Sequence, residues 1–244
     1  MSTIWVIFKR ELTSYFTTPI AYVFLVIFIF LSGIFAFDLG DFFARGQADL
    51  VAFFNFHPWL YLFLIPALSM RLWAEERRGG TIELLLTLPV TMTQAVVAKF
   101  LAAWAFTAIA LTLTFPMWMT VNYLGEPDNG VIAASYVGSL LMAGAFLAIG
   151  SCLSALTRNQ VIAFVMSAVV CLAFVLSGFP LVLQFFSGWA PDSVVALISS
   201  FSFLSHFNSI AKGVIDLRDA VFFLSLIAFW LFANAVFIEW KKAG

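Results

Sequence analysis

Residues 131–156 read VIAASYVGSLLMAGAFLAIGSCLSAL, a run of 26 residues without a single charge. An α-helix of about 20 apolar residues is long enough to cross the hydrocarbon core of a bilayer. The rest of the chain has the same character, since 63% of its 244 residues are hydrophobic and only 10% are charged. Soluble domains carry about 25% charged residues. The composition therefore predicts an all-α integral membrane protein.

Six apolar runs predict six membrane spans. They are residues 19–38, 56–74, 94–121, 131–156, 161–183 and 219–240. The second run is the weakest, because Pro66 lies inside it and Arg71 lies near its end. Pro116 is expected to kink the outer end of the third span, since proline removes a helical hydrogen bond.

The distribution of basic residues predicts the orientation. Six spans place both termini on the same side of the membrane, and in this arrangement that side carries nine of the twelve Lys and Arg residues. Short loops rich in Lys and Arg stay in the cytoplasm. Both termini are therefore predicted to be cytoplasmic, with residues 39–55, 122–130 and 184–218 outside.

Residues 1–18 are expected to form an amphipathic helix that lies at the membrane interface. Trp5, Phe8, Leu12 and Tyr15 recur at helical spacing, with polar residues on the rest of the helical wheel. The alternative interpretation is a cytoplasmic tail with no fixed position on the membrane.

The segment 75–93 predicts a second helix outside the membrane, over residues 81–88. Thr81 is a suitable N-cap, and Glu83 lies in the first turn, where the helix dipole favours a carboxylate. Pro89 ends the helix. Its four leucines make it too apolar for a solvent loop. It is expected to pack against the membrane, its own bundle or a partner protein.

Two further segments predict packing features. The outer residues 184–218 are expected to form one or two short helices that dip into the outer leaflet or cap the bundle. In the fourth span, Ser, Ala and Gly recur four residues apart, as at Ser135, Ser139 and Ala143. Small residues at this spacing allow helices to approach closely, so this face is expected to pack within the bundle.

The sequence gives little support to other functions. No span carries a charge near its centre, which disfavours an ion-coupled transporter or channel subunit. An intramembrane enzyme would need a nucleophile or a metal set, but no HExxH or GxSxG motif is present, and hydrogen bonding explains His57 and His206 better than a metal site. Cys152 and Cys171 lie in apolar runs and are expected to be buried thiols. A net charge of −1 disfavours nucleic acid as a partner.

Three stretches carry a resemblance to a known family. Residues 76–90, ERRGGTIELLLTLPV, followed by KFLA at 99–102, resemble the first cytoplasmic loop of ABC-2 type permeases. Residues 8–19, FKRELTSYFTTP, look like the interfacial helix that leads into the first span of the same family. Residues 207–219, FNSIAKGVIDLRD, are similar to the branch typified by the gliding-motility-associated ABC permease subunit.

The resemblance implies an ABC-2 exporter fold as one transmembrane domain over residues 1–244. It has six spans, the interfacial helix in 1–18, a coupling helix in 75–93 and short re-entrant helices in 184–218, before span six. The residues implied to couple to an ATPase are Glu76, Gly80, Thr81, Glu83, Leu84, Leu85 and Pro89. Those of the interfacial helix are Phe8, Lys9, Arg10 and Glu11. No catalytic or metal-binding residue is implied.

The implied function is the permease subunit of an ABC exporter in a bacterial-type inner membrane. No GxxxxGK[ST] motif is present, so the ATPase would be a separate subunit that binds ATP and Mg²⁺, while this chain binds no cofactor. A second permease chain, identical or different, and membrane lipid are further implied partners, and an extracytoplasmic accessory subunit is compatible with the family. The alternative is a complex that passes mechanical work to an extracytoplasmic partner instead of moving cargo.

The translocation path is expected at the interface between the two permeases. Span two leads directly into the coupling segment, and span five offers Phe174, Ser177 and Phe179 as an apolar constriction with few polar contacts. The alternative is that these three residues only pack against lipid or within their own bundle.

Overall fold

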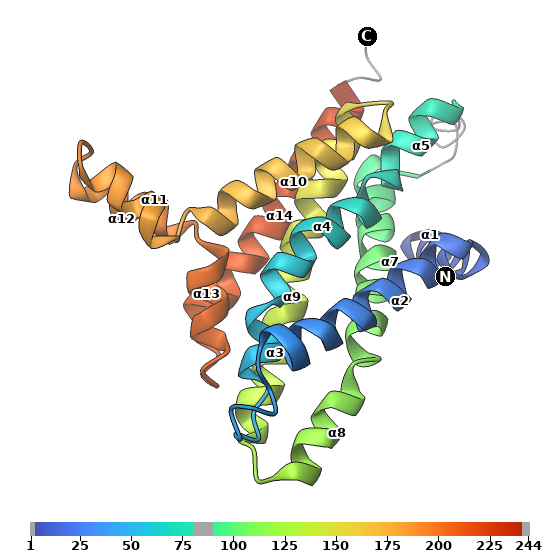
Figure 1. The fold of residues 1–244 in the computed structure, drawn as a ribbon. Helices are drawn as coiled ribbons and strands as arrows, with labels where there is room; N and C mark the ends of the chain where they lie inside the picture. The colour runs from blue at the N-terminus through green and yellow to red at the C-terminus, as the bar shows by residue number, and fades with distance from the viewer. Residues whose placement is uncertain (1–2, 81–89, 241–244) are drawn as a thin grey trace.

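The computed structural model describes residues 3–80 and 90–240. Every secondary-structure element in these two ranges is helical (Figure 1). In chain order the elements are α1 (Thr3–Thr17), α2 (Pro19–Ile34), the π-helical η1 (Phe35–Leu39), α3 (Val51–Asn55), α4 (His57–Ser69), α5 (Arg71–Gly79), α7 (Met92–Thr112), α8 (Phe115–Leu124), α9 (Asn129–Leu156), α10 (Gln160–Leu176), α11 (Pro180–Ser187), α12 (Asp192–Ser200), α13 (Phe203–Ile210) and α14 (Leu217–Trp240).

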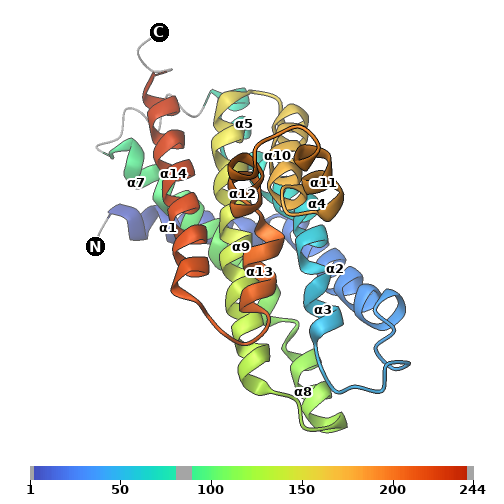
Figure 2. The same ribbon diagram turned by 90° about the vertical axis from the view of Figure 1, so that its left-hand side faces the viewer.

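Helix α9 is the centre of the bundle. It contacts α14, α10, α4 and α7, and most of its residues are buried (Figure 2). At three glycines of α9, a side chain from another part of the bundle approaches the backbone closely. A Cβ atom at Gly138 would lie 2.8 Å from Ile210, one at Gly144 would lie 3.0 Å from Trp104, and one at Gly150 would lie 2.7 Å from the Cβ of Ser69. The small residues of this span therefore pack within the bundle, as predicted.

Four helical segments are long and apolar enough to cross a membrane. They are Ala21–Leu39, Met92–Leu124, Asn129–Leu156 and Leu217–Trp240. Two bent helix pairs, α10 with α11 and α12 with α13, raise the count to as many as six if each pair is one span. The four segments correspond to the first, third, fourth and sixth predicted spans.

The second predicted span is not a single helix of spanning length. It is divided at Met70 into α4, which has 13 residues, and the polar α5. Pro66 has no backbone N–H group, so α4 already lacks one helical hydrogen bond before the break. Ser154 of α9 then stabilises the break, because its hydroxyl accepts the N–H groups of Trp73 and Ala74 and donates to the Met70 carbonyl.

The fifth predicted span, 161–183, is also broken. Helix α10 ends at Leu176, and α11 begins at Pro180 with its axis turned by 74°. Proline at the first position favours a new helix over continuation of the old one. Gly178 permits the close approach of α13, because a Cβ atom there would lie 2.6 Å from the Cβ of Ser202.

The ends of the other predicted elements agree with the sequence patterns. Helix α1 covers the predicted interfacial segment, packs along α7 and ends at Thr17, and Pro19 begins α2. The third span bends at Leu113 and Thr114, and Pro116 lies in the first turn of α8.

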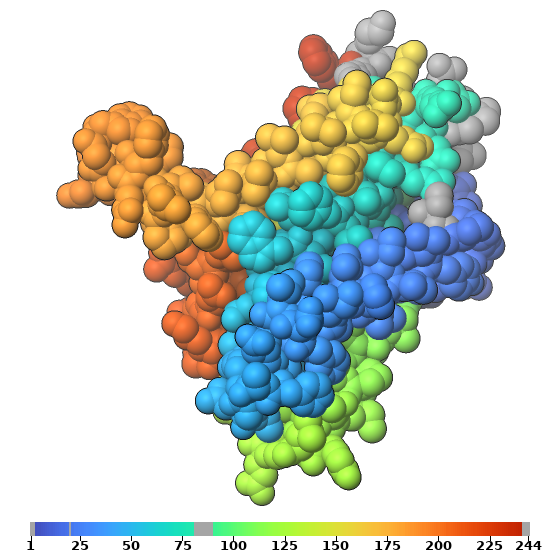
Figure 3. Space-filling model, viewed as in Figure 1, coloured from blue at the N-terminus to red at the C-terminus, as the bar shows by residue number. Residues whose placement is uncertain are grey.

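The segment 184–218 holds more helical structure than the one or two predicted helices. Helix α13 packs against α9 and α14 with Phe203, Phe207 and Ile210 buried. The last turn of α11 and all of α12 are also helical, and neither helix has a buried residue. These two helices form an arm that stands off from the bundle (Figure 3).

Candidate functional site

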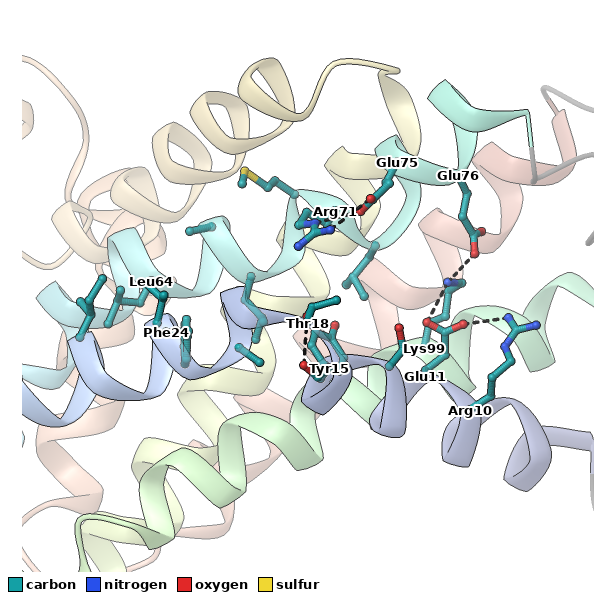
Figure 4. Close-up of a pocket in the computed structure, with 18 residues that line it drawn as sticks. Arg10, Glu11, Tyr15, Thr18, Phe24, Leu64, Arg71, Glu75, Glu76 and Lys99 are labelled. Atoms are coloured by element: carbon teal, nitrogen blue, oxygen red, sulfur yellow. Dashed lines mark hydrogen bonds and ion pairs between the residues drawn. The ribbon is translucent and has the colours of Figure 1, made fainter.

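A buried lysine joins three helices at one end of the bundle. Lys99 of α7 is 3% exposed, and its Nζ atom lies 2.7 Å from Oε1 of Glu76 in α5 and 3.2 Å from Oε2 of Glu11 in α1 (Figure 4). The Nζ atom also lies 5.4 Å from the centre of the Trp73 ring. We call Lys99, Glu11 and Glu76 the charge cluster.

The carboxylates of the charge cluster compensate the charge of its buried lysine. A buried ammonium group is costly unless carboxylates compensate it, and here two do. Arg10 adds a hydrogen bond of 2.9 Å to Glu11. Burial alone would raise the pKa of Glu11, but the charge of Lys99 and the hydrogen bonds from Arg10 and Lys99 outweigh it, so the pKa lies below its ordinary value. Glu11 therefore stays ionised at neutral pH.

Local sequence signals place the cluster beside the predicted coupling segment. Gly80, with φ of +70°, ends α5 one turn after Glu76. Thr91 and Gln94 form a capping box that starts α7, about two turns before Lys99. The ion pair between Glu76 and Lys99 thus joins the helices on either side of residues 81–89.

Helix α5 is also fixed to the core on its other side. The indole Nε1 of Trp73 donates to the Ser151 hydroxyl at 3.2 Å, and Asn234 of α14 donates to the same hydroxyl at 2.9 Å. Ser154 supplies the N-terminal cap of α5 from α9. These contacts connect the polar α5 to α9 at the centre of the bundle and, through Ser151, to α14.

The predicted coupling residues fall into two groups. Glu76 lies in the charge cluster, and Gly80 forms the end of α5. The other five lie outside the described residues: Thr81, Glu83, Leu84, Leu85 and Pro89.

Two of the four predicted residues of α1 belong to or support the charge cluster, and the other two lie apart from it. Glu11 belongs to the charge cluster and Arg10 supports it. Phe8 stacks on Trp5 with ring centres 5.2 Å apart, and Lys9 is exposed. Lys99 was not predicted as a site residue, although a lone lysine within the apolar α7 is a signal of a buried partner.

The three residues predicted for the translocation path differ in their surroundings. Phe174 stacks on Phe203 of α13 with ring centres 5.0 Å apart. The Ser177 hydroxyl donates to the Phe174 carbonyl. Phe179 is 36% exposed and is the member of the set most open to a partner or lipid.

The histidines and cysteines are buried in separate places. Cys152 and Cys171 are both fully buried, as predicted. His57 is hydrogen-bonded to Ser139 and His206 to Asp219, and both side chains are buried. Among the described residues, no group of three or more His, Cys, Asp or Glu side chains is arranged to hold a metal ion.

Comparison with known proteins gives the family. No curated protein matches the chain. The sequence model of the ABC-2 family transporter proteins matches residues 5–238, from the first turn of α1 to the last turn of α14, and so includes all three members of the charge cluster. The chain therefore belongs to the ABC-2 transporter family and is a multi-pass membrane permease component of an ABC transporter, which works with an ABC ATPase subunit.

Proposed function

We propose that this chain is an export permease whose charge cluster transmits movement from the ATPase to the membrane helices. The observation that supports the proposal is the position of Lys99. It binds Glu76 at one flank of the segment 81–89 and lies on the helix that forms the other flank. It also holds Glu11 of α1.

The ion pairs of the charge cluster would make α1, α5 and α7 move as one body. Removing one partner from a buried ion pair costs about 3–5 kcal/mol. A force from the ATPase that is too small to break these pairs would therefore shift α1, α5 and α7 together. Ser154 and Ser151 pass the displacement of α5 to α9 and α14. In this mechanism Glu83 and the leucines of 81–88 would contact the ATPase directly, while ATP and Mg²⁺ bind to the ATPase.

The finer assignment rests on sequence arguments. The basic residues support cytoplasmic termini in a bacterial-type inner membrane, and the family resemblance supports export by a pair of permease chains. The motif at 207–219 supports the gliding-motility branch. A second candidate function is transmission of force to an extracytoplasmic partner. The arm of α11 and α12 favours it, because neither helix has a buried residue and the arm projects sideways from the bundle (Figure 1), where a partner could bind it.

Substitution of Lys99 tests the coupling proposal. In the complex reconstituted with its ATPase, we expect Lys99→Met to abolish the stimulation of ATP hydrolysis by transport, while Lys99→Arg retains part of it. The matched control is Lys212→Met, because Lys212 is exposed and belongs to the segment after α13. Full coupled activity in a correctly assembled Lys99→Met complex would contradict the proposal. Glu76→Gln, which leaves the pair of Lys99 with Glu11, serves as a milder second variant.

A further inference from the structure

A cavity of about 610 Å³ lies between the α1–α2 pair and the α4–α5 pair. Its lining changes from charged to apolar along its length. In Figure 4 the charged side chains lie toward one end, and Phe24 and Leu64 lie toward the other.

The charged end has no net charge. It is lined by the three cations Arg10, Arg71 and Lys99 and by the three carboxylates Glu11, Glu75 and Glu76. Lys99 is already compensated by Glu11 and Glu76. Arg71 and Glu75 are paired with each other at 2.8 Å but remain 28% and 52% exposed. They therefore offer one charge of each sign to a ligand.

Arg71 and Tyr15 have unused donors. The bonds of Arg71 to Glu75 use Nε and Nη2, and a guanidinium group has five N–H donors. Tyr15 also lines the cavity, and its hydroxyl finds no hydrogen-bond partner in residues 3–80 or 90–240. Burial raises the pKa of Tyr15, and the charge of Glu11 raises it further, so the hydroxyl remains a neutral donor.

The apolar end opens sideways on a membrane-spanning helix. Val23 and Ile27 of α2 line it and are 55% and 40% exposed. Both belong to the segment Ala21–Leu39, which is long and apolar enough to cross a membrane. The acyl chains of the surrounding lipid therefore have direct access to the slot between α2 and Leu64 of α4.

We propose that this cavity binds one phospholipid with a zwitterionic headgroup. The phosphate would lie against Arg71 and the Tyr15 hydroxyl, the ammonium group against Glu75, and one acyl chain in the slot beside Leu64. Ligand pockets of about 300–1,000 Å³ are typical of small molecules. This cavity therefore has room for the headgroup, the glycerol and the start of a chain. A lining of balanced charge matches a zwitterion, whereas an anionic lipid could pair with Arg71 but would bring no cation to Glu75.

The test is photo-crosslinking of the purified full chain in nanodiscs, without ATPase or nucleotide. The probe is a phosphatidylethanolamine with a photoreactive group in its acyl chain, and the crosslinked peptides are mapped by mass spectrometry. We expect labelling on α2 and α4. Unlabelled phosphatidylethanolamine should compete with the probe more strongly than phosphatidylglycerol.

Two pairs of variants sharpen the test. Arg71→Gln should reduce labelling by about tenfold, as expected for a lost charge-assisted hydrogen bond. Arg45→Gln should not, although Arg45 makes the same i,i+4 pair with Asp49 at a similar exposure of 34%. Ala67→Trp fills the cavity and should abolish labelling, whereas Ala133→Trp, at an exposed position of α9, should not. Thermal unfolding of each variant reports whether it is folded.

Glu75→Gln gives the most specific result. It removes the proposed ammonium site, so the preference should shift from phosphatidylethanolamine toward phosphatidylglycerol. The proposal is overturned by equal labelling in the Arg71 and Arg45 variants, by a wild-type preference for phosphatidylglycerol, or by labels that map away from α2 and α4. Because no ATPase is present, failure of the coupling mechanism leaves this result unaffected.

Discussion

The Glu11 carboxylate carries a pH dependence that follows from its surroundings. Its pKa in the folded protein lies below the ordinary value of 4.5. The stabilisation is therefore complete above pH 4.5 and is lost as the pH falls through the lowered pKa. We expect the melting temperature in detergent to fall more steeply in the wild type than in Glu11→Gln as the pH drops below 4.5.

The control for this measurement is Glu126→Gln, because Glu126 is exposed and lies outside the charge cluster. This variant should keep the pH slope of the wild type. An unchanged slope in Glu11→Gln would show that Lys99 and Arg10 do not hold the carboxylate in its ionised form. The slope contributed by one carboxylate is at most about 1.4 kcal/mol per pH unit.

Individual residues were predictable where their role is local. Gly80 follows two basic residues at the end of α5 and adopts the left-handed conformation that glycine favours. Lys99 was missed because its partners, Glu76 and Glu11, come from α5 and α1 and meet it only through tertiary packing. The sequence marks the lysine as unusual but does not specify which carboxylates reach it.

At the scale of elements, the cap of α5 is supplied by another helix. Ser154 of α9 accepts the N–H groups of Trp73 and Ala74. We expect Ser154→Ala to lower the free energy of unfolding by about 1–2 kcal/mol, the usual cost of losing an N-cap. Ser187→Ala on the exposed α11 should change it by less than about 0.5 kcal/mol, since that hydroxyl only bonds back to Gln184 in its own helix. Equal effects in a denaturant titration would argue against a cap.

The starts of α2 and α8 followed the sequence, because a proline acts there on its own helix, whereas the proline that begins α11 was not predicted to break the fifth span. Pro19 begins α2, and Pro116 begins α8 within its first turn. The breaks inside the second and fifth predicted spans were not predicted, because contacts with another helix stabilise each break. Ser154 of α9 stabilises the break at Met70, and Ser202 packs on Gly178 at the bend after α10. Hydropathy measures how apolar a segment is and contains no information on such contacts.

For the whole molecule, burial separates the centre from the surface. Most residues of helix α9 are buried, whereas α2 and α14 expose rows of large apolar side chains, such as Phe30 and Phe232. In water such surfaces would aggregate, and in a bilayer they face lipid or another subunit. The proposed second permease would therefore bind to one of these outer faces, and the buried residues of α9 are excluded from that interface.

The orientation of the whole molecule gives a further prediction. The loops at 40–50 and 124–128 lie at the same end, because a Cβ atom at Gly125 would lie 2.7 Å from the Cβ of Ala48. The last turn of α5 adjoins the turn after α9, since Arg158 and Arg77 interact electrostatically. Single cysteines at Gln47 and Glu126 should therefore react alike with a membrane-impermeant maleimide.

We expect Gln47→Cys and Glu126→Cys to be labelled on intact cells, and Gly79→Cys to be labelled only after the membrane is opened. The reason is the excess of Lys and Arg on the side that carries the termini. All three positions are exposed, so burial does not limit the reaction. The native Cys152 and Cys171 are fully buried and should give a low background. Labelling of Gly79→Cys on intact cells would reverse the orientation and place the charge cluster on the side without ATP, which would also remove the basis for ATPase coupling through α5.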